Sequence, residues 1–103
     1  MGHRIVYLSD ATLDLNRIYA EIAAAAGLPI ADRFFAGLIA FIRALETFPE
    51  RGTVRSGRIP GLRIIGYRHS ISLAFVVRGD SVVIVGVFRR GQNISDEILA
   101  GRL

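Results

Sequence analysis

The spacing of apolar residues along the chain predicts two helices followed by strands. Between positions 11 and 25, apolar residues recur every three or four positions, as on the buried face of an amphipathic helix, and Ser9 is a suitable N-cap for that helix. Gly27 can end it, and Pro29 can begin a second helix over roughly residues 30–48. Because so few residues join the two helices, they must lie antiparallel as a helical hairpin.

Short apolar runs predict the strands. Residues 5–8 form a strand before the helices, and residues 62–65 form one after a polar loop in which residues 53–55 could add another. Residues 71–77 alternate between apolar and small or polar side chains, as a strand with one buried face does. Residues 82–88 are apolar on both faces, which places this strand centrally in the sheet.

This order of elements predicts a single α+β domain over residues 1–103. It has an N-terminal strand, an antiparallel helical hairpin, and then a mostly antiparallel twisted sheet of three to four strands, with the hairpin on one face. Residues 78–81 form a turn between strands, and the tail over residues 95–103 forms a short helix capped by Ser95. We predict a core between hairpin and sheet that contains Leu15, Ile18, Leu38, Phe41, Leu45, Phe75 and Ile84.

The composition adds a surplus of apolar residues to this fold. Hydrophobic residues make up 51% of the chain, yet no apolar run is long enough to cross a bilayer, and the start of the chain does not resemble a signal peptide. Two interpretations stay open: a well-filled core rich in alanine, or a surface that a partner covers. Apolar residues span too wide an arc of the second helix for one face, so Phe35, Ile39 and Ile42 are candidates for that surface.

Charge points to an acidic partner or a nucleic-acid complex. All 13 basic residues are arginine, and the net charge is +4. The predicted strands suggest only one cluster of charged residues, which consists of Arg63, Arg68, Arg89 and Arg90. They either converge on one basic surface that binds phosphate or an acidic protein, or act independently as solvated surface residues.

Residues for acid–base, thiol or metal chemistry are scarce. The chain has no cysteine, which excludes disulfides and cysteine-based zinc sites and fits a cytoplasmic protein. His3 lies near the N-terminus, and His69 has no carboxylate near it in sequence, so neither predicts a general base or a metal site. We find no nucleophile elbow and no phosphate-binding glycine loop. We therefore expect neither a cofactor nor a metal ion.

Four short motifs in order resemble ParE toxins of the RelE/ParE superfamily, over roughly residues 5–93. They are Ala11-x-x-Asp14-Leu15-x-x-Ile18 in the first predicted helix, Phe48-Pro49-Glu50-x-Gly52 at the exit of the second, Pro60-Gly61-Leu62-Arg63 followed by Gly66-Tyr67-Arg68, and Val87-Phe88-Arg89-Arg90-Gly91-Gln92-Asn93. The resemblance implies the toxin of a bacterial type II toxin–antitoxin pair. A small acidic antitoxin that becomes ordered on binding would silence it in a hetero-oligomer.

The resemblance leaves two classes of cellular target open, DNA gyrase and the ribosome, and a third interpretation without a target. ParE toxins poison DNA gyrase, whereas RelE toxins cleave mRNA on the ribosome with a basic cluster and often a late tyrosine. Arg63 and Arg90 stand where two of those basic residues would fall and would be catalytic in a nuclease. However, no tyrosine follows Tyr67 and a lysine-rich stretch is absent, which favours a binding toxin over an enzyme. Direct nucleic-acid contact stays open but is not expected of the chain alone. A relic that retains only antitoxin binding is the third reading.

Overall fold

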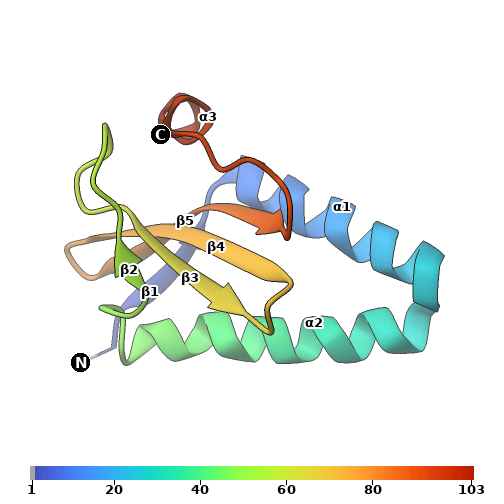
Figure 1. Ribbon diagram of the computed structural model, residues 1–103. Coiled ribbons are helices and arrows are strands. Elements are labelled where there is room, and N and C mark those ends of the chain that lie inside the picture. The colour runs from blue at the N-terminus through green and yellow to red at the C-terminus, as the bar shows by residue number, and fades with distance from the viewer. Residues whose placement is uncertain (1) are drawn as a thin grey trace.

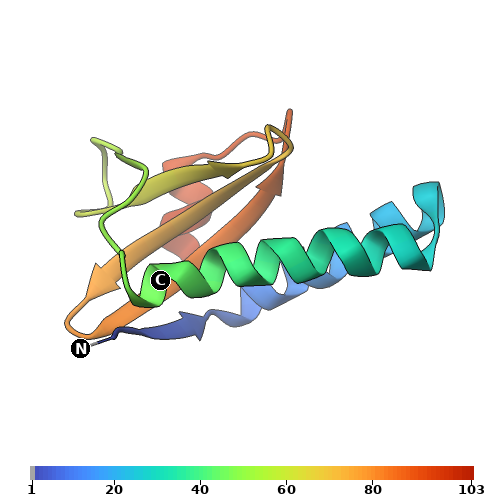
Figure 2. The same ribbon diagram turned by 90° about the horizontal axis from the view of Figure 1, so that it is seen from below.

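In the computed structural model, which describes residues 2–103, a helical hairpin lies against one face of a five-stranded sheet (Figures 1 and 2). The strand order is β1-β5-β4-β3-β2; β1 is parallel to β5, and every other neighbouring pair is antiparallel. This confirms the predicted α+β class and the order of its elements. The elements are β1 (Arg4–Tyr7), α1 (Ser9–Ala26), α2 (Leu28–Arg43), a 3₁₀ turn (Ala44–Glu46), β2 (Thr53–Val54), β3 (Arg63–Tyr67), β4 (Ile71–Arg78), β5 (Ser81–Arg89) and α3 (Asp96–Arg102).

A single residue, Gly27, connects the two helices of the hairpin. Its φ of 95° is accessible to glycine at little cost, and its N–H donates to the carbonyl of Ala23 and so closes α1. Pro29 lies in the first turn of α2, where a missing N–H costs nothing. The prediction that these two residues end one helix and begin the next is confirmed.

Two predicted helix ends are wrong. Leu8, not Ser9, is the N-cap of α1: its N–H still bonds to Ile84 of β5 while its carbonyl accepts the N–H of Thr12, so the chain passes from strand to helix without a capping side chain. The second helix ends at Arg43 and tightens into the 3₁₀ turn instead of reaching residue 48. Pro49 disfavours helical geometry at Phe48, so it explains why no helix continues past the turn but not why α2 ends at Arg43.

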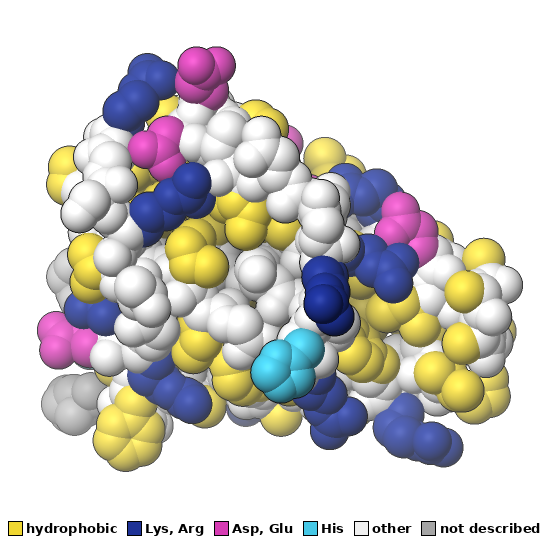
Figure 3. Space-filling model, in the orientation of Figure 1, with side chains coloured by type: hydrophobic (Ala, Val, Ile, Leu, Met, Phe, Trp, Pro, Cys, Tyr) yellow, Lys and Arg dark blue, Asp and Glu magenta, His cyan; other side chains and the backbone are white. Residues whose placement is uncertain are grey.

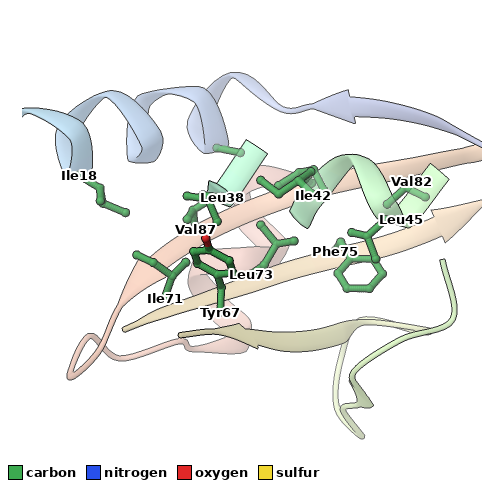
Figure 4. Close-up of a cluster of buried hydrophobic side chains, with 12 residues drawn as sticks. Ile18, Leu38, Ile42, Leu45, Tyr67, Ile71, Leu73, Phe75, Val82 and Val87 are labelled. Carbon is green, nitrogen blue, oxygen red and sulfur yellow. The ribbon is translucent and has the colours of Figure 1, made fainter. Parts of the chain in front are cut away.

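The hairpin face of the sheet carries the larger core (Figure 4). Of the predicted core residues, Leu15 and Phe41 are only half-buried at its border, and the other five are fully buried. In Figure 4 the labelled side chains from both helices and from the sheet point toward one another. The buried members are Ala11, Ile18, Leu38, Ile42, Leu45, Tyr67, Ile71, Leu73, Phe75, Val82, Ile84 and Val87.

A second core covers the opposite face of the sheet. The C-terminal helix α3 and the connection between β2 and β3 lie over it, as Figure 1 shows. Ser95 caps α3 as predicted, because its Oγ accepts the N–H of Ile98 at 3.1 Å. The buried members are Ile59, Leu62, Ala74, Val76, Val85, Phe88 and Leu99.

A β-bulge in β5 decides which of its side chains faces which core. Ala74 pairs with Gly86 but Phe75 pairs with Ile84, so Val85 is the extra residue. Ile84 and Val87 therefore face the hairpin, whereas Val85 and Phe88 lie in the second core. The alternation of faces is shifted by one residue for the rest of the strand.

None of the described helices has the length and apolar character needed to cross a membrane.

Candidate functional site

The free edge of β5 is closed by an ion pair between α1 and α3. Strand β1 ends at Tyr7, opposite Ile84, so the outer edge of β5 has no partner strand beyond that point. Asp14 of α1 accepts the N–H of Val87 at 3.0 Å, and Arg102 of α3 donates to the carbonyl of Val85 at 3.1 Å. Side chains thus satisfy the backbone groups that a neighbouring strand would otherwise pair.

Asp14 and Arg102 also bind each other. The two Nη atoms of Arg102 lie 2.6 and 3.3 Å from the two carboxylate oxygens of Asp14, which is only 2% exposed. Gly86 makes room for this pair, since a Cβ there would lie 2.7 Å from Nη1 of Arg102. Sequence reasoning named neither residue as a contact, although Asp14 was a signal: it is the one charged residue within the apolar stripe of α1. The pair is a structural clamp that holds α3 on the sheet.

Three of the four predicted site arginines lie at one end of the sheet. Arg68 is in the turn between β3 and β4, and Arg89 and Arg90 are where β5 ends. The N–H of Arg90 donates to the carbonyl of Ser70 at 2.9 Å, which holds the two segments side by side. Figure 3 shows arginine side chains on both sides of a histidine over this end of the sheet.

Arg63 is not part of this group, so convergence of all four arginines, one of the two interpretations left open by the sequence, does not occur. It lies at the start of β3 and pairs with Phe75, whereas Arg89 pairs with Ile71. Four residues of β4 separate these rows, which is about 13 Å along a strand. Arg63 begins β3 and Arg68 directly follows its other end, so the two residues lie at opposite ends of the sheet.

Arg89 and Arg90 have different surroundings. Because of the bulge, Arg89 is on the hairpin side, where its Nη1 lies 3.1 Å from Oε1 of Glu21 on α1. Both side chains of this pair remain nearly half exposed, so Arg89 reaches a carboxylate and solvent and avoids the cost of an unpaired buried charge. Arg90 is exposed and belongs to none of the ion pairs found among residues 2–103.

The turn between β3 and β4 is strained. Arg68 and His69 have φ values of 52° and 58°, a conformation that glycine and asparagine adopt readily but that costs other residues roughly 1–3 kcal/mol each. The preceding residue, Tyr67, fixes the turn to the core: it is 8% exposed and its ring packs against Phe34 and Phe41 of α2. The guanidinium of Arg68 lies 5.5 Å from the centre of the Tyr67 ring.

The outer side of the hairpin carries a shallow hollow of about 400 Å³. Phe35 and Ile39 line it as half-buried residues, but Ile42 is fully buried against the sheet. The prediction of Ile42 as a partner contact is therefore wrong, because it lies on the inner arc of α2. The hydroxyl of Tyr19 donates to Asp32 at the rim, and this hydrogen bond raises the pKa of Tyr19 above its usual value. The lining is Tyr19, Asp32, Phe35, Ala36, Ile39, Ala40 and Arg43.

Comparison with known proteins identifies the family. Residues 4–94 match the model of the ParE toxin of the type II toxin-antitoxin system parDE. The chain belongs to the ParE toxin family. A search of curated proteins found no match.

Solved structures agree with the ParE fold. A structure of the chromosomal ParDE toxin–antitoxin system from P. aeruginosa has 23% sequence identity and a TM-score of 0.72, with 84% of this chain and 95% of that chain covered. The toxin–antitoxin complex RelBE2 from Mycobacterium tuberculosis has 21% identity and a TM-score of 0.65, with 89% and 95% covered. At this identity the likeness establishes the α+β fold of the ParE chain.

Proposed function

We propose that this ParE toxin acts by binding DNA gyrase and halting replication, and that a cognate acidic antitoxin silences it. Membership of the ParE family supports a toxin that binds its target. The separation of Arg63 from Arg90 is the observation that favours binding over catalysis. A nuclease that used both residues would need them on one phosphate, and their strand positions lie about 13 Å apart along the sheet.

The position of Tyr67 also favours binding over cleavage. It is the last tyrosine of the chain, and its ring is buried beneath α2, where it contacts Phe34 and Phe41. A general acid or base has to reach the substrate proton directly or through one water molecule. Tyr67 does not offer that access while the hairpin is packed on the sheet.

We place the antitoxin contact on the hollow of the outer hairpin, with further contacts to the exposed arginines. Phe35 and Ile39 offer the apolar floor that an amphipathic segment needs, and Arg43 at the rim forms no ion pair within residues 2–103. Only Arg17, Arg55, Arg89 and Arg102 form such pairs there, so most arginines remain free to bind acidic side chains. The complex is then a hetero-oligomer of toxin and antitoxin.

Expression of the toxin without its antitoxin tests the target. Gyrase poisoning should induce the DNA-damage response and filamentation, and purified toxin should make gyrase accumulate cleaved DNA. Primer extension on translated messages should show no new cuts. Codon-dependent cuts that disappear in Arg63→Gln and Arg90→Gln would establish a nuclease instead. Normal growth together with tight antitoxin binding would indicate a relic.

A charge placed in the hollow tests the antitoxin contact. Ala40 is exposed and lines the hollow, so Ala40→Glu leaves the core intact but sets a like charge against an acidic partner. We expect weaker antitoxin binding in titration calorimetry and unchanged toxicity. Ala24→Glu is the matched control, because Ala24 is an exposed helical alanine that does not line the hollow. Equal affinities for the two variants would remove the hollow from the interface.

A further inference from the structure

Two turns meet at the end of the sheet where Arg68, His69 and Arg90 lie; we call these three residues the basic end. The N–H of Ser70 closes the first turn on the carbonyl of Tyr67 at 3.1 Å. The second turn is closed by Gln92, whose N–H donates to the carbonyl of Arg89 and whose Oε1 accepts the N–H of Arg89. The bond from Arg90 to Ser70 joins the turns, so the backbone beneath the basic end is held at several points.

Among the described residues 2–103, no carboxylate pairs with a side chain of the basic end. Glu21 pairs with Arg89 and with Arg17, and within residues 2–103 neither Arg68 nor Arg90 takes part in any ion pair. All three side chains of the basic end are exposed. Two like charges held on adjacent turns without a counter-charge make a local positive field that attracts anions.

The strained turn indicates that the side chains themselves are needed there. Two consecutive positive φ values are the geometry of a type I′ turn, for which Asn-Gly is the favoured pair. This chain has Arg-His instead, and the strain remains because Tyr67 anchors the turn in the core. Such strain in a well-anchored segment is typical of residues retained for binding.

The chemistry of the basic end fits phosphates of a double helix. Arginine side chains supply hydrogen-bond donors and no acceptors, as contacts to backbone phosphates require. A single-stranded nucleic acid would need exposed aromatic rings on which bases stack, but Tyr67 is buried and Arg68 lies over its ring. We propose that Arg68, His69 and Arg90 together contact the phosphate backbone of duplex DNA, without reading its sequence.

This contact goes beyond gyrase binding and can be measured on the purified full chain alone. Fluorescence anisotropy with a labelled 20-base-pair duplex should show binding that weakens as salt increases, with a log–log slope of about −0.9 for each phosphate contacted. Arg68→Gln and Arg90→Gln should each make that slope shallower by about one contact. Arg78→Gln is the matched control, because Arg78 is exposed at the other end of β4 and forms no ion pair with any residue that the structure describes.

A turn replacement separates binding from folding. Arg68→Asn with His69→Gly gives the turn its favoured residues, so the melting temperature should rise while duplex affinity falls at least as far as in Arg68→Gln. The proposal is overturned if Arg78→Gln changes the slope as much as Arg90→Gln does, or if the turn replacement keeps full affinity. Tighter binding of the single strand than of its duplex would overturn it as well. None of these outcomes depends on whether gyrase is the target.

Discussion

The two faces of the sheet are buried by very different means. On one face, α1 and α2 contribute long apolar stripes to a cluster that reaches from β3 to β5. On the other, a helix of seven residues covers a smaller cluster, and its only fully buried side chain is that of Leu99. Helices this short are unstable by themselves, so α3 depends on its contacts with the sheet.

The difference predicts that the hairpin face of the toxin is more stable than the C-terminal helix α3. Many apolar contacts stabilise the hairpin face, so we expect that face to stay folded when α3 is released. The opposite face relies on Leu99, the Ser95 cap and the clamp between Asp14 and Arg102. A single substitution on the hairpin face should therefore unfold the whole domain, whereas one on the opposite face should release only α3.

The largest loss is expected for Phe75→Ala on the hairpin face. Phe75 is fully buried, and removal of a core phenylalanine costs about 3–5 kcal/mol, enough to threaten a domain of this size. Phe41→Ala should cost less, because Phe41 is half-buried. Urea denaturation of both variants measures the difference, and a Phe41 variant that is the less stable of the two would contradict this ranking.

Asp14→Ala should come next, with a loss of about 3 kcal/mol, because it leaves Arg102 and the N–H of Val87 without their partner. Hydrogen exchange should reveal faster exchange in α3 and at the edge of β5. A double-mutant cycle with Arg102→Ala gives the coupling energy of the pair. Additive losses would show that the clamp does not hold α3.

Leu99→Ala should cost about 2 kcal/mol, at the low end for a buried leucine, because a terminal helix can shift to fill part of the cavity. The exchange of amide hydrogens in α3 should become faster while that of the hairpin stays slow. Ile98→Ala is the control, since Ile98 is 47% exposed on the same helix. Simultaneous loss of protection in hairpin and α3 would mean that the two faces fold as one unit.

The smallest changes in stability are expected at the two adjacent arginines, Arg89 and Arg90, and they differ between the two. Arg90→Glu should change stability by no more than about 0.5 kcal/mol, because Arg90 is exposed and unpaired within residues 2–103. Arg89→Glu should cost slightly more, up to about 1 kcal/mol, because it replaces an exposed ion pair to Glu21 with a like-charge pair. Thermal denaturation at low and high salt tests this, since added salt should shrink only the Arg89 effect.

Local patterns in the sequence determined most of the architecture. The 3.6-residue period of apolar positions predicts both helices, and Gly27 with Pro29 places their junction. The apolar run at residues 82–88 predicts a central strand, and this is correct only for the first half of β5, because β1 pairs it no further than Ile84. Ser95 places the start of α3. These features depend on neighbours in the chain, so their physical causes can be recognised without knowledge of the tertiary fold.

Contacts between distant residues were decided only by the tertiary structure. The bulge at Val85 turns Arg89 toward α1 and leaves Arg90 on the other side. Gly86 beside it is a local sign of a bulge, but a glycine alone does not fix which residue is the extra one. Strand register also separates Arg63 from Arg90. The clamp joins residues 88 positions apart, because β1 stops short and leaves the edge of β5 to Asp14 and Arg102. Register and edge pairing depend on how strands meet in space, which periodicity along one strand does not specify.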